Sequence, residues 1–240
     1  MLSKWLPFRR QKAPFAPIAP AQPFTAVGDI HGRADLLERF LENAPDHQII
    51  CVGDYVDRGD HSADVLRILQ GRSDIICLSG NHEEMMLRFL EDPVKYGQRW
   101  LRYGGLQTLA SFGIGTVTEG GDDGALKGAA VQLAQALGSD LLHWLRHLPN
   151  HWQSGNVAVV HAGADPALPI IDQKTRHLHW GHKNFETTRR TDDLWVLHGH
   201  TIIGTPVVEN GRISIDTGAY ATGRLTAAHV YQSGIDFGTA

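Results

Sequence analysis

The fold of this chain is decided by the stretch FTAVGDIHG, residues 24–32. Residues 24–27 predict a short buried strand, and residues 28–32 form a polar turn with a glycine at each end. The same order returns in IICVGDYVDRG, residues 49–59, and in IICLSGNHE, residues 75–83. Because an amphipathic segment follows each turn, this half of the chain predicts a βαβαβα rhythm.

The C-terminal half adds further strands that end in polar turns. We expect one strand over residues 157–160, which leads into His161-Ala-Gly163, and another over 194–197, which leads into His198-Gly-His200. Two more β segments are expected near 207–215 and 225–231, and residues 94–150 predict mainly helix. The carboxyl ends of strands in α/β sheets are where ligands bind, so these turns are the expected site.

Length and composition favour one large domain. The chain has 240 residues, of which 42% are hydrophobic and 20% charged, enough to bury a substantial core. We expect a flexible Pro/Ala-rich leader over residues 1–22 and a single domain over 23–240. The formal net charge of -4 gives no reason to expect stable binding to nucleic acid.

The two cysteines indicate a reducing compartment. Cys51 and Cys77 each lie inside an apolar run, as buried thiols do, so we expect no disulfide. The sequence also contains no apolar run of signal-peptide or membrane-spanning length. These features predict a cytoplasmic protein. They do not predict its oligomeric state.

The polar turns carry oxygen and imidazole ligands in a set typical of a two-metal site. Two divalent cations need such ligands from several strand ends, with one carboxylate able to bridge both ions. Any one of these residues alone would be an ordinary turn former. As an ordered set after successive strands they predict a metal site formed by Asp29, His31, Asp54, Asn81, His161 and His200.

Five motifs in this order carry a family resemblance: Gly-Asp-x-His-Gly, Gly-Asp-x-x-Asp-Arg-Gly, Gly-Asn-His-Glu, His-Ala-Gly and Gly-His-Thr. The chain resembles the calcineurin-like metallophosphoesterase superfamily over residues 24–232, and within it the phosphoprotein phosphatase branch. It is similar to bacterial serine/threonine phosphatases and to symmetrical diadenosine-tetraphosphate hydrolases. The resemblance includes residues 100–105, WLRYGG, and residues 215–219, IDTGA.

The resemblance implies a fold and a metal centre. The implied fold is an α/β four-layer αββα sandwich with two central mixed β-sheets. One divalent ion would be held by Asp29, His31 and Asp54, and the other by Asp54, Asn81, His161 and His200. The implied nucleophile is a hydroxide that bridges the two ions. Manganese is the expected metal, with iron and zinc as alternatives.

The resemblance also implies the residues that act on the substrate. His82 would be the general acid, Asp57 would orient its ring, and Arg58 would bind phosphate oxygens. Relatives carry Trp-x-Arg after the His-Ala-Gly motif, with the arginine as a second phosphate clamp, whereas this chain has Trp180-Gly-His182-Lys183. We expect His182, or Lys183, to bind phosphate in its place.

Several neighbouring residues are expected to play supporting roles. The side chain of His198 should point away from that of His200, because alternate residues of a strand face opposite sides. Asp216 and Thr217 fit either a supporting role at the site or a simple turn. Glu83 is expected to cap or line a helix. Tyr220 is expected beside the cleft.

Three functions are compatible with these motifs. The first is a serine/threonine-type phosphoprotein phosphatase. The second is a pyrophosphohydrolase for diadenosine tetraphosphate or a capped nucleotide, for which Trp100, Tyr103 and Trp180 are candidate base-stacking residues. The third is a metal-stabilised phosphate-binding module without catalysis. The partner is accordingly a phosphorylated protein or a nucleotide.

Overall fold

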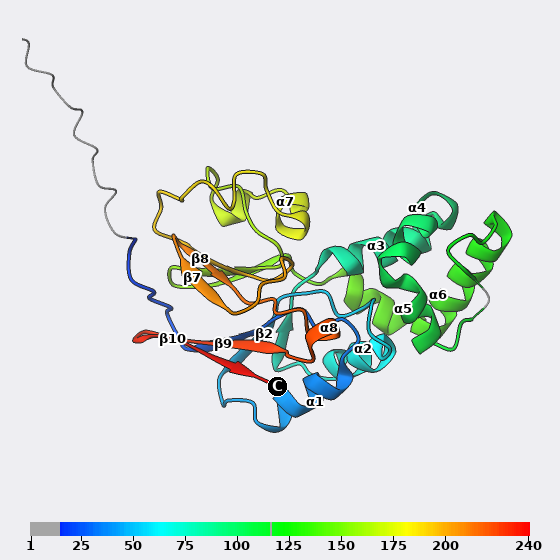
Figure 1. The fold of residues 1–240 in the computed structure, drawn as a ribbon, viewed down its shortest axis with the longest axis horizontal. Helices are drawn as coiled ribbons and strands as arrows, with labels where there is room; N and C mark the ends of the chain where they lie inside the picture. The colour runs from blue at the N-terminus through cyan, green and yellow to red at the C-terminus, as the bar shows by residue number, and fades with distance from the viewer. Residues whose placement is uncertain (1–14, 116) are drawn as a thin grey trace, which may run out of the picture.

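The computed structural model describes residues 15–115 and 117–240, and its centre consists of two five-stranded sheets (Figure 1). The first sheet has the strand order β10-β9-β1-β2-β3. Its parallel strands are β1 (Phe24–Val27), β2 (Gln48–Cys51) and β3 (Ile75–Cys77). Strand β9 (Thr226–Tyr231) runs antiparallel to β1, and β10 (Gly234–Thr239) runs antiparallel to β9.

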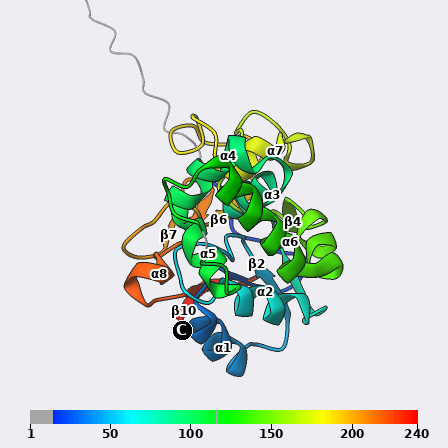
Figure 2. The same cartoon turned by 90° about the vertical axis from the view of Figure 1, so that its right-hand side faces the viewer.

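The second sheet is also mixed, with the order β4-β5-β6-β8-β7. Strands β5 (Val157–Val160), β6 (Trp195–His198) and β8 (Arg212–Ser214) are parallel. Antiparallel strands β4 (His151–Ser154) and β7 (Val207–Glu209) form its two edges. The two sheets stack face to face, with helices around them (Figures 1 and 2).

The helices fall into three groups (Figures 1 and 2). Helices α1 (Ala34–Glu42) and α2 (Ser62–Gln70) pack on the outer face of the first sheet. Beside the sheets lie α3 (Asn81–Glu91), α4 (Pro93–Trp100), the π-helical turn Leu101–Gly105, α5 (Leu106–Ser111) and α6 (Asp123–Arg146). The 3-10 turn Ile170–Asp172 and α7 (Thr175–Trp180) cover the second sheet, and α8 (Ala219–Thr222) precedes β9. Within residues 15–115 and 117–240, no helix combines the length and apolar character needed to cross a membrane.

Three apolar cores separate the four layers, and the two-residue period of the strands builds them. Along β5, Val157 and Val159 face the core between the sheets, whereas Ala158 and Val160 face the core under α7. Along β1, Phe24 lies in the core between the sheets, and Val27 lies in the core under α1 and α2. This layering confirms the predicted αββα sandwich with two mixed sheets.

The segment before β1 differs from the expected flexible leader. Phe15 packs edge-on against Trp195, with ring centroids 5.0 Å apart, and the indole of Trp195 donates a hydrogen bond to the carbonyl oxygen of Ala16. Asn156 accepts from the Ala19 amide at 2.7 Å through its side chain. Residues 15–22 therefore pack on the second sheet. The rest of the expected leader lies outside the described residues.

Two strands, β4 and β10, were not predicted. Both are sheet edges, where a strand needs only one partner and the sequence is only partly apolar. Cys51 and Cys77 lie opposite each other on the adjacent strands β2 and β3. Both are buried free thiols, as predicted.

Candidate metal centre

The turns at the strand ends hold several predicted site residues in a left-handed backbone conformation. Positive φ angles occur at His31 (44°), Asp54 (55°), Asp57 (72°), Arg58 (70°) and His200 (65°). Non-glycine residues rarely adopt this region, and it is enriched at functional sites. The glycines between them allow the turns to approach closely, since a Cβ on Gly80 would collide with the side chain of Asp54.

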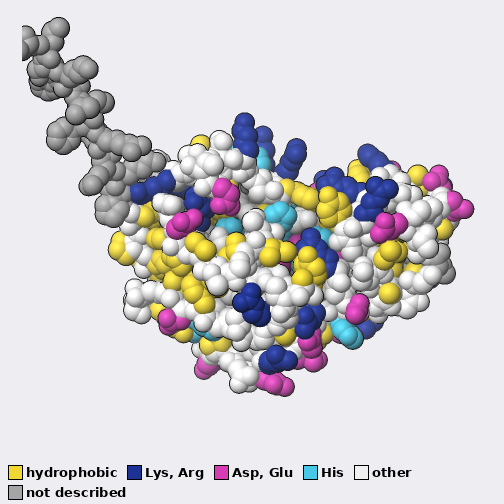
Figure 3. Space-filling view, viewed as in Figure 1, with side chains coloured by type: hydrophobic (Ala, Val, Ile, Leu, Met, Phe, Trp, Pro, Cys, Tyr) yellow, Lys and Arg dark blue, Asp and Glu magenta, His cyan; other side chains and the backbone are white. Residues whose placement is uncertain are grey.

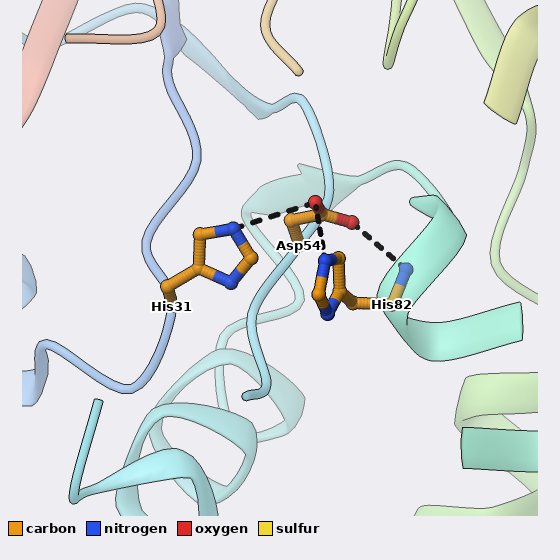
Figure 4. A group of neighbouring side chains, drawn as sticks. All are labelled: His31, Asp54 and His82. Atoms are coloured by element: carbon orange, nitrogen blue, oxygen red, sulfur yellow. Dashed lines mark hydrogen bonds and ion pairs between the residues drawn. The ribbon is translucent and has the colours of Figure 1, made fainter. Parts of the chain in front are cut away.

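Asp54 lies at the centre of the site. Its Oδ2 is 3.5 Å from Nε2 of His31 and 3.9 Å from Nε2 of His82, and the three side chains point toward one another (Figure 4). Its Oδ1 is 3.3 Å from Nε2 of His161. The His82 backbone N–H also donates to Oδ1, at 3.0 Å. The two carboxylate oxygens thus face different groups of histidines, as a carboxylate that bridges two metal ions requires.

The other predicted ligands converge on the same place. Nε2 of His161 is 2.8 Å from Oδ1 of Asn81, and the rings of His161 and His200 meet edge-on with centroids 5.1 Å apart. Asp29 accepts a hydrogen bond from the His200 backbone N–H at 3.0 Å. The structure therefore brings together all six predicted ligands, from both sheets. Figure 3 shows histidine side chains in the hollow of this face, with lysines and arginines around it.

Burial sets the charge of these groups. It lowers the pKa of His31 and of His161 to about 3, and it also lowers the pKa of His200. The neutral imidazole that results is the form that binds a metal ion. Burial alone would raise the pKa of Asp54, but His161, His82 and His31 outweigh it and hold the pKa below its ordinary value.

Crowded carboxylates show that the site fits cations. Burial, together with the carboxylates of Asp216 and Asp54, raises the pKa of Asp29 well above its usual range. Burial and Asp54 likewise raise the pKa of Asp216 to about 6. Bound divalent ions would relieve this repulsion, because they are the strongest local charges such a site can hold. Possible metal-binding atoms gather in two groups of three residues, and both groups include Asp54. One group is His31, Asp54 and His82, and the other is Asp54, His161 and His200.

His82 and Asp57 form a buried pair beside Asp54. Nδ1 of His82 donates to Oδ2 of Asp57 at 2.6 Å, and Asp57 also accepts from the Thr108 hydroxyl at 2.6 Å and the Trp100 indole at 3.0 Å. Burial lowers the pKa of His82, but Asp54 and Asp57 outweigh it and leave that pKa raised. The carboxylate of Asp57 therefore orients the ring and favours its protonated form.

Arg58 lies over this pair at the edge of the site. Its guanidinium is 3.2 Å from Nε2 of His82 and stacks over the ring of Tyr220, 4.9 Å from the ring centroid. Gly104, with φ at 112°, lets the π-helical turn pass against the Arg58 backbone, where a Cβ would lie 2.5 Å from the Arg58 nitrogen. Tyr220 thus lies beside the cleft, as expected.

His182 lines a hollow of about 300 Å³ together with Lys183 and the metal-ligand candidate His200. Its Nε2 is 3.7 Å from Oδ2 of Asp165. His182 and Lys183, which were expected to replace the second clamp arginine, therefore both line the hollow next to His200.

Of the three candidate stacking residues, Trp100 is buried at 1% exposure and packs on Phe89, with ring centroids 4.6 Å apart. Its indole N–H donates a hydrogen bond to Asp57, and the ring is buried, so no ring face is available to stack on a ligand. Tyr103 is 47% exposed and lines a hollow with Arg58. Trp180 is half-buried under the guanidinium of Arg99.

Glu83 has a larger role than sequence reasoning assigned to it. Its buried carboxylate accepts hydrogen bonds from the backbone N–H groups of Asp54, Tyr55 and Gly80 at 2.8–3.0 Å. It thereby caps α3 and also ties the α3 turn to the turn that carries Asp54. The helix-cap signal was readable in the sequence, but the bonds across to residues 54 and 55 were not.

His198 points away from the metal centre, as predicted. Its ring is buried against Phe185, with ring centroids 4.9 Å apart, and its Nε2 is 2.9 Å from the Ser214 hydroxyl. Asp216 accepts from the Gly218 amide at 2.8 Å in a turn, and it also lies close enough to Asp29 to raise the pKa of that carboxyl.

Comparison with known proteins identifies relatives of this site and fold. A family model described as calcineurin-like phosphoesterase matches residues 22–204. The bis(5'-nucleosyl)-tetraphosphatase PrpE (asymmetrical) of Oceanobacillus iheyensis is 26% identical over 84% of this chain and 86% of its own length.

Two further proteins are similar over different spans. The serine/threonine-protein phosphatase 2 of Escherichia coli strain K12 is 41% identical, over 33% of this chain and 37% of its own length. A crystal structure of a protein assigned as a diadenosine tetraphosphatase superposes with a TM-score of 0.64 at 21% identity. It covers 92% of this chain and 94% of the other, which supports the shared fold.

Proposed function

This chain belongs to the calcineurin-like phosphoesterase family, and on that premise we propose that it is a two-metal phosphatase that removes phosphate from phosphoserine or phosphothreonine in proteins. The observation that carries the proposal is the placement of Asp54. One of its carboxylate oxygens faces His31 and the other faces His161, at 3.5 and 3.3 Å. A bridging carboxylate with histidines on both sides is the arrangement that a two-metal hydrolase needs.

The geometry and the family resemblance together support an assignment of the residues that would hold the metal ions. Asp29, His31 and Asp54 would hold one ion, and Asp54, Asn81, His161 and His200 the other. When bound, the two ions activate water and stabilise the charge that develops on the phosphoryl group. Manganese is the metal we expect, because carboxylate and amide oxygens suit it; iron and zinc, which imidazole also suits, are the alternatives.

The chain's own side chains would then handle the leaving group and the phosphate. In this proposal His82 donates a proton from Nε2 to the departing oxygen, while Asp57 holds the opposite ring nitrogen. The guanidinium of Arg58 now lies 3.2 Å from that Nε2. A substrate phosphate would draw Arg58 into bidentate hydrogen bonds and leave Nε2 facing the leaving oxygen.

On the opposite side, we assign phosphate binding to His182, with Lys183 next to it. Both line the hollow that also contains His200. An imidazole lacks the paired N–H donors with which a guanidinium holds two phosphate oxygens at once, so phosphate binding at this position should be weaker than with an arginine.

A protein substrate is supported by the surface beside the site. Trp180 lines both the hollow that contains His200 and a second hollow of about 570 Å³ that contains Arg99 and Arg176. Two hollows that share Trp180, one beside His200 and one lined by arginines, suit a peptide with acidic residues near its phosphorylated side chain.

A second candidate function is cleavage of dinucleoside tetraphosphates, as the name of the Oceanobacillus iheyensis relative describes for that protein. The supporting observation is the hollow of about 430 Å³ formed by Arg58, Tyr103 and Tyr220. The exposed ring of Tyr103 could stack on a base while Arg58 binds phosphate.

Product analysis tests both candidates and the binding module. The protein is incubated with Mn²⁺ and either a phosphoserine peptide or diadenosine tetraphosphate. Release of phosphate from the peptide supports the phosphatase. AMP and ATP indicate asymmetrical cleavage of the dinucleotide, and two molecules of ADP indicate symmetrical cleavage. Metal-dependent binding without any product would refute both activities and favour a phosphate-binding module.

A further inference from the structure

A second group of potential metal ligands lies outside the centre described above. It consists of Asp165, in the loop after β5, His177, on α7, and His182, in the turn after α7. One carboxylate oxygen and one nitrogen from each ring lie within 4.8 Å of one another. The rings of His177 and His182 have their centroids 4.6 Å apart.

The hydrogen bonds around this group leave its metal-binding atoms facing each other. Nδ1 of His182 accepts from the Asn184 backbone N–H at 3.4 Å, and Oδ1 of Asp165 accepts from the Ala167 N–H at 3.0 Å. Nε2 of His182 therefore faces Oδ2 of Asp165, at 3.7 Å. That separation is too long for a hydrogen bond, so the two atoms lie opposite each other without being joined.

His177 contributes a buried ring nitrogen without a hydrogen-bond partner. Within residues 15–115 and 117–240, its Nδ1 is the buried side-chain nitrogen or oxygen that has no hydrogen-bond partner. A buried polar atom without a partner costs free energy, and native structures contain few of them. The imidazole of His177 can satisfy this requirement if the group binds a ligand that accepts a nitrogen lone pair.

We propose that Asp165, His177 and His182 form a third metal site, selective for Zn²⁺ or a similar transition-metal ion. Two histidines and one carboxylate are a ligand set that zinc uses, with water or a substrate oxygen in the fourth position. Ligands of a tetrahedral zinc ion lie roughly 3.4 Å apart, given metal–ligand distances of about 2.0–2.2 Å. The 3.7 Å between His182 and Asp165 needs only a small adjustment.

The protonation of the group agrees with this geometry. Burial, and then the neighbouring His182, lower the pKa of His177, which favours the neutral ring. A metal ion binds only the neutral ring, so no proton has to be displaced from His177 at neutral pH.

The third ion would also explain how the cleft functions without a second clamp arginine, a consequence that rests on the proposed function. A divalent ion with one carboxylate ligand has a net charge of about +1, the same as a guanidinium. With the ion bound, His182 holds the cation, and the cation supplies the positive charge on this side of the cleft. The metal site itself does not depend on the reaction.

Metal content measures the site independently of activity. The full chain is stripped with chelator, loaded with Zn²⁺, freed of excess metal and measured by inductively coupled plasma mass spectrometry. We expect three zinc ions per chain in the wild type and two in His177→Ala and in Asp165→Asn. The control is His143→Ala, which removes an exposed histidine of α6 whose ring centroid lies 4.1 Å from that of His147 after the helix end, and it should still bind three.

A ligand variant of the main centre separates this proposal from the previous one. Asp54→Asn should lose zinc from the two-metal centre but keep the ion that His177→Ala removes. If Asp54→Asn lowers the zinc content as expected while His177→Ala keeps the wild-type content, the third site is refuted and the two-metal centre stands.

The wild type provides a test that does not depend on variant folding. Titration with Co²⁺ follows ion binding by the visible absorption of the bound ion, which is strongest in tetrahedral sites. Saturation after three equivalents, with the third lost in the folded variants His177→Ala or Asp165→Asn, supports the site. Saturation of the wild type after two equivalents overturns it.

Discussion

Replacement of Asp57 by asparagine tests the proton donor assigned to this enzyme. Asp57 is fully buried, and it contacts His82 at 2.6 Å. A hydrogen bond to a charged group contributes about 1.5–3 kcal/mol. Because a neutral amide at this position would no longer stabilise the protonated ring, we expect Asp57→Asn to lower kcat about 10- to 100-fold at neutral pH.

The loss should depend on the leaving group and on pH. An alkyl ester such as phosphoserine needs a proton on its departing oxygen, whereas p-nitrophenyl phosphate releases a stable anion. Asp57 helps to raise the pKa of His82, and His82 donates its proton only below that pKa. Asp57→Asn lowers the pKa, so activity on the alkyl ester should begin to fall at a lower pH than in the wild type.

The assay compares kcat across pH for the two esters in the wild type and the variant. Thermal unfolding confirms that the variant is folded, since the introduced amide would replace the carboxylate that accepts from the Trp100 and Thr108 donors. The control is Asp64→Asn, which removes an exposed carboxylate 3.3 Å from His61 and should leave kcat unchanged. Equal losses for both esters, with an unmoved pH profile, would refute the role of His82 as the acid.

Three further results are expected. Glu83→Gln should lower the free energy of unfolding by about 2–4 kcal/mol in urea titrations, because an amide NH₂ would face backbone N–H donors; a change below about 0.5 kcal/mol would contradict this. Gly104→Ala should lower kcat/KM about tenfold or more by displacing Arg58, whereas Gly113→Ala, also at positive φ but in open space, should change only stability. Chelation should abolish hydrolysis and lower Tm, with recovery on Mn²⁺ addition; full activity in chelator would remove the metal centre from the mechanism.

The sequence predicted the parts of the site that depend on local chain geometry. Each ligand turn follows a short apolar strand, so the parallel strands had to bring Asp29, Asp54 and Asn81 to one edge. His82 and Asp57 came instead from the family resemblance. For both groups, the pattern along the chain was enough to name the residues, although not their distances.

Features that depend on tertiary contacts were missed. Trp100 was a candidate base-stacking residue, but its indole is buried and donates a hydrogen bond to Asp57. Residues 15–22 were read as a leader because their Ala/Pro composition is typical of flexible segments, whereas Phe15 finds a partner in Trp195. The group formed by Asp165 and two histidines has no recognisable spacing and appears only after the loop around α7 is folded.

The position of β1 affects how the chain must fold during synthesis. Residues 24–27 leave the ribosome well before residues 226–231, yet these form β9, one of the two sheet neighbours of β1. Until then one edge of β1 has no partner for its backbone hydrogen bonds. Nascent chains are therefore expected to need protection against aggregation at this edge until β9 emerges.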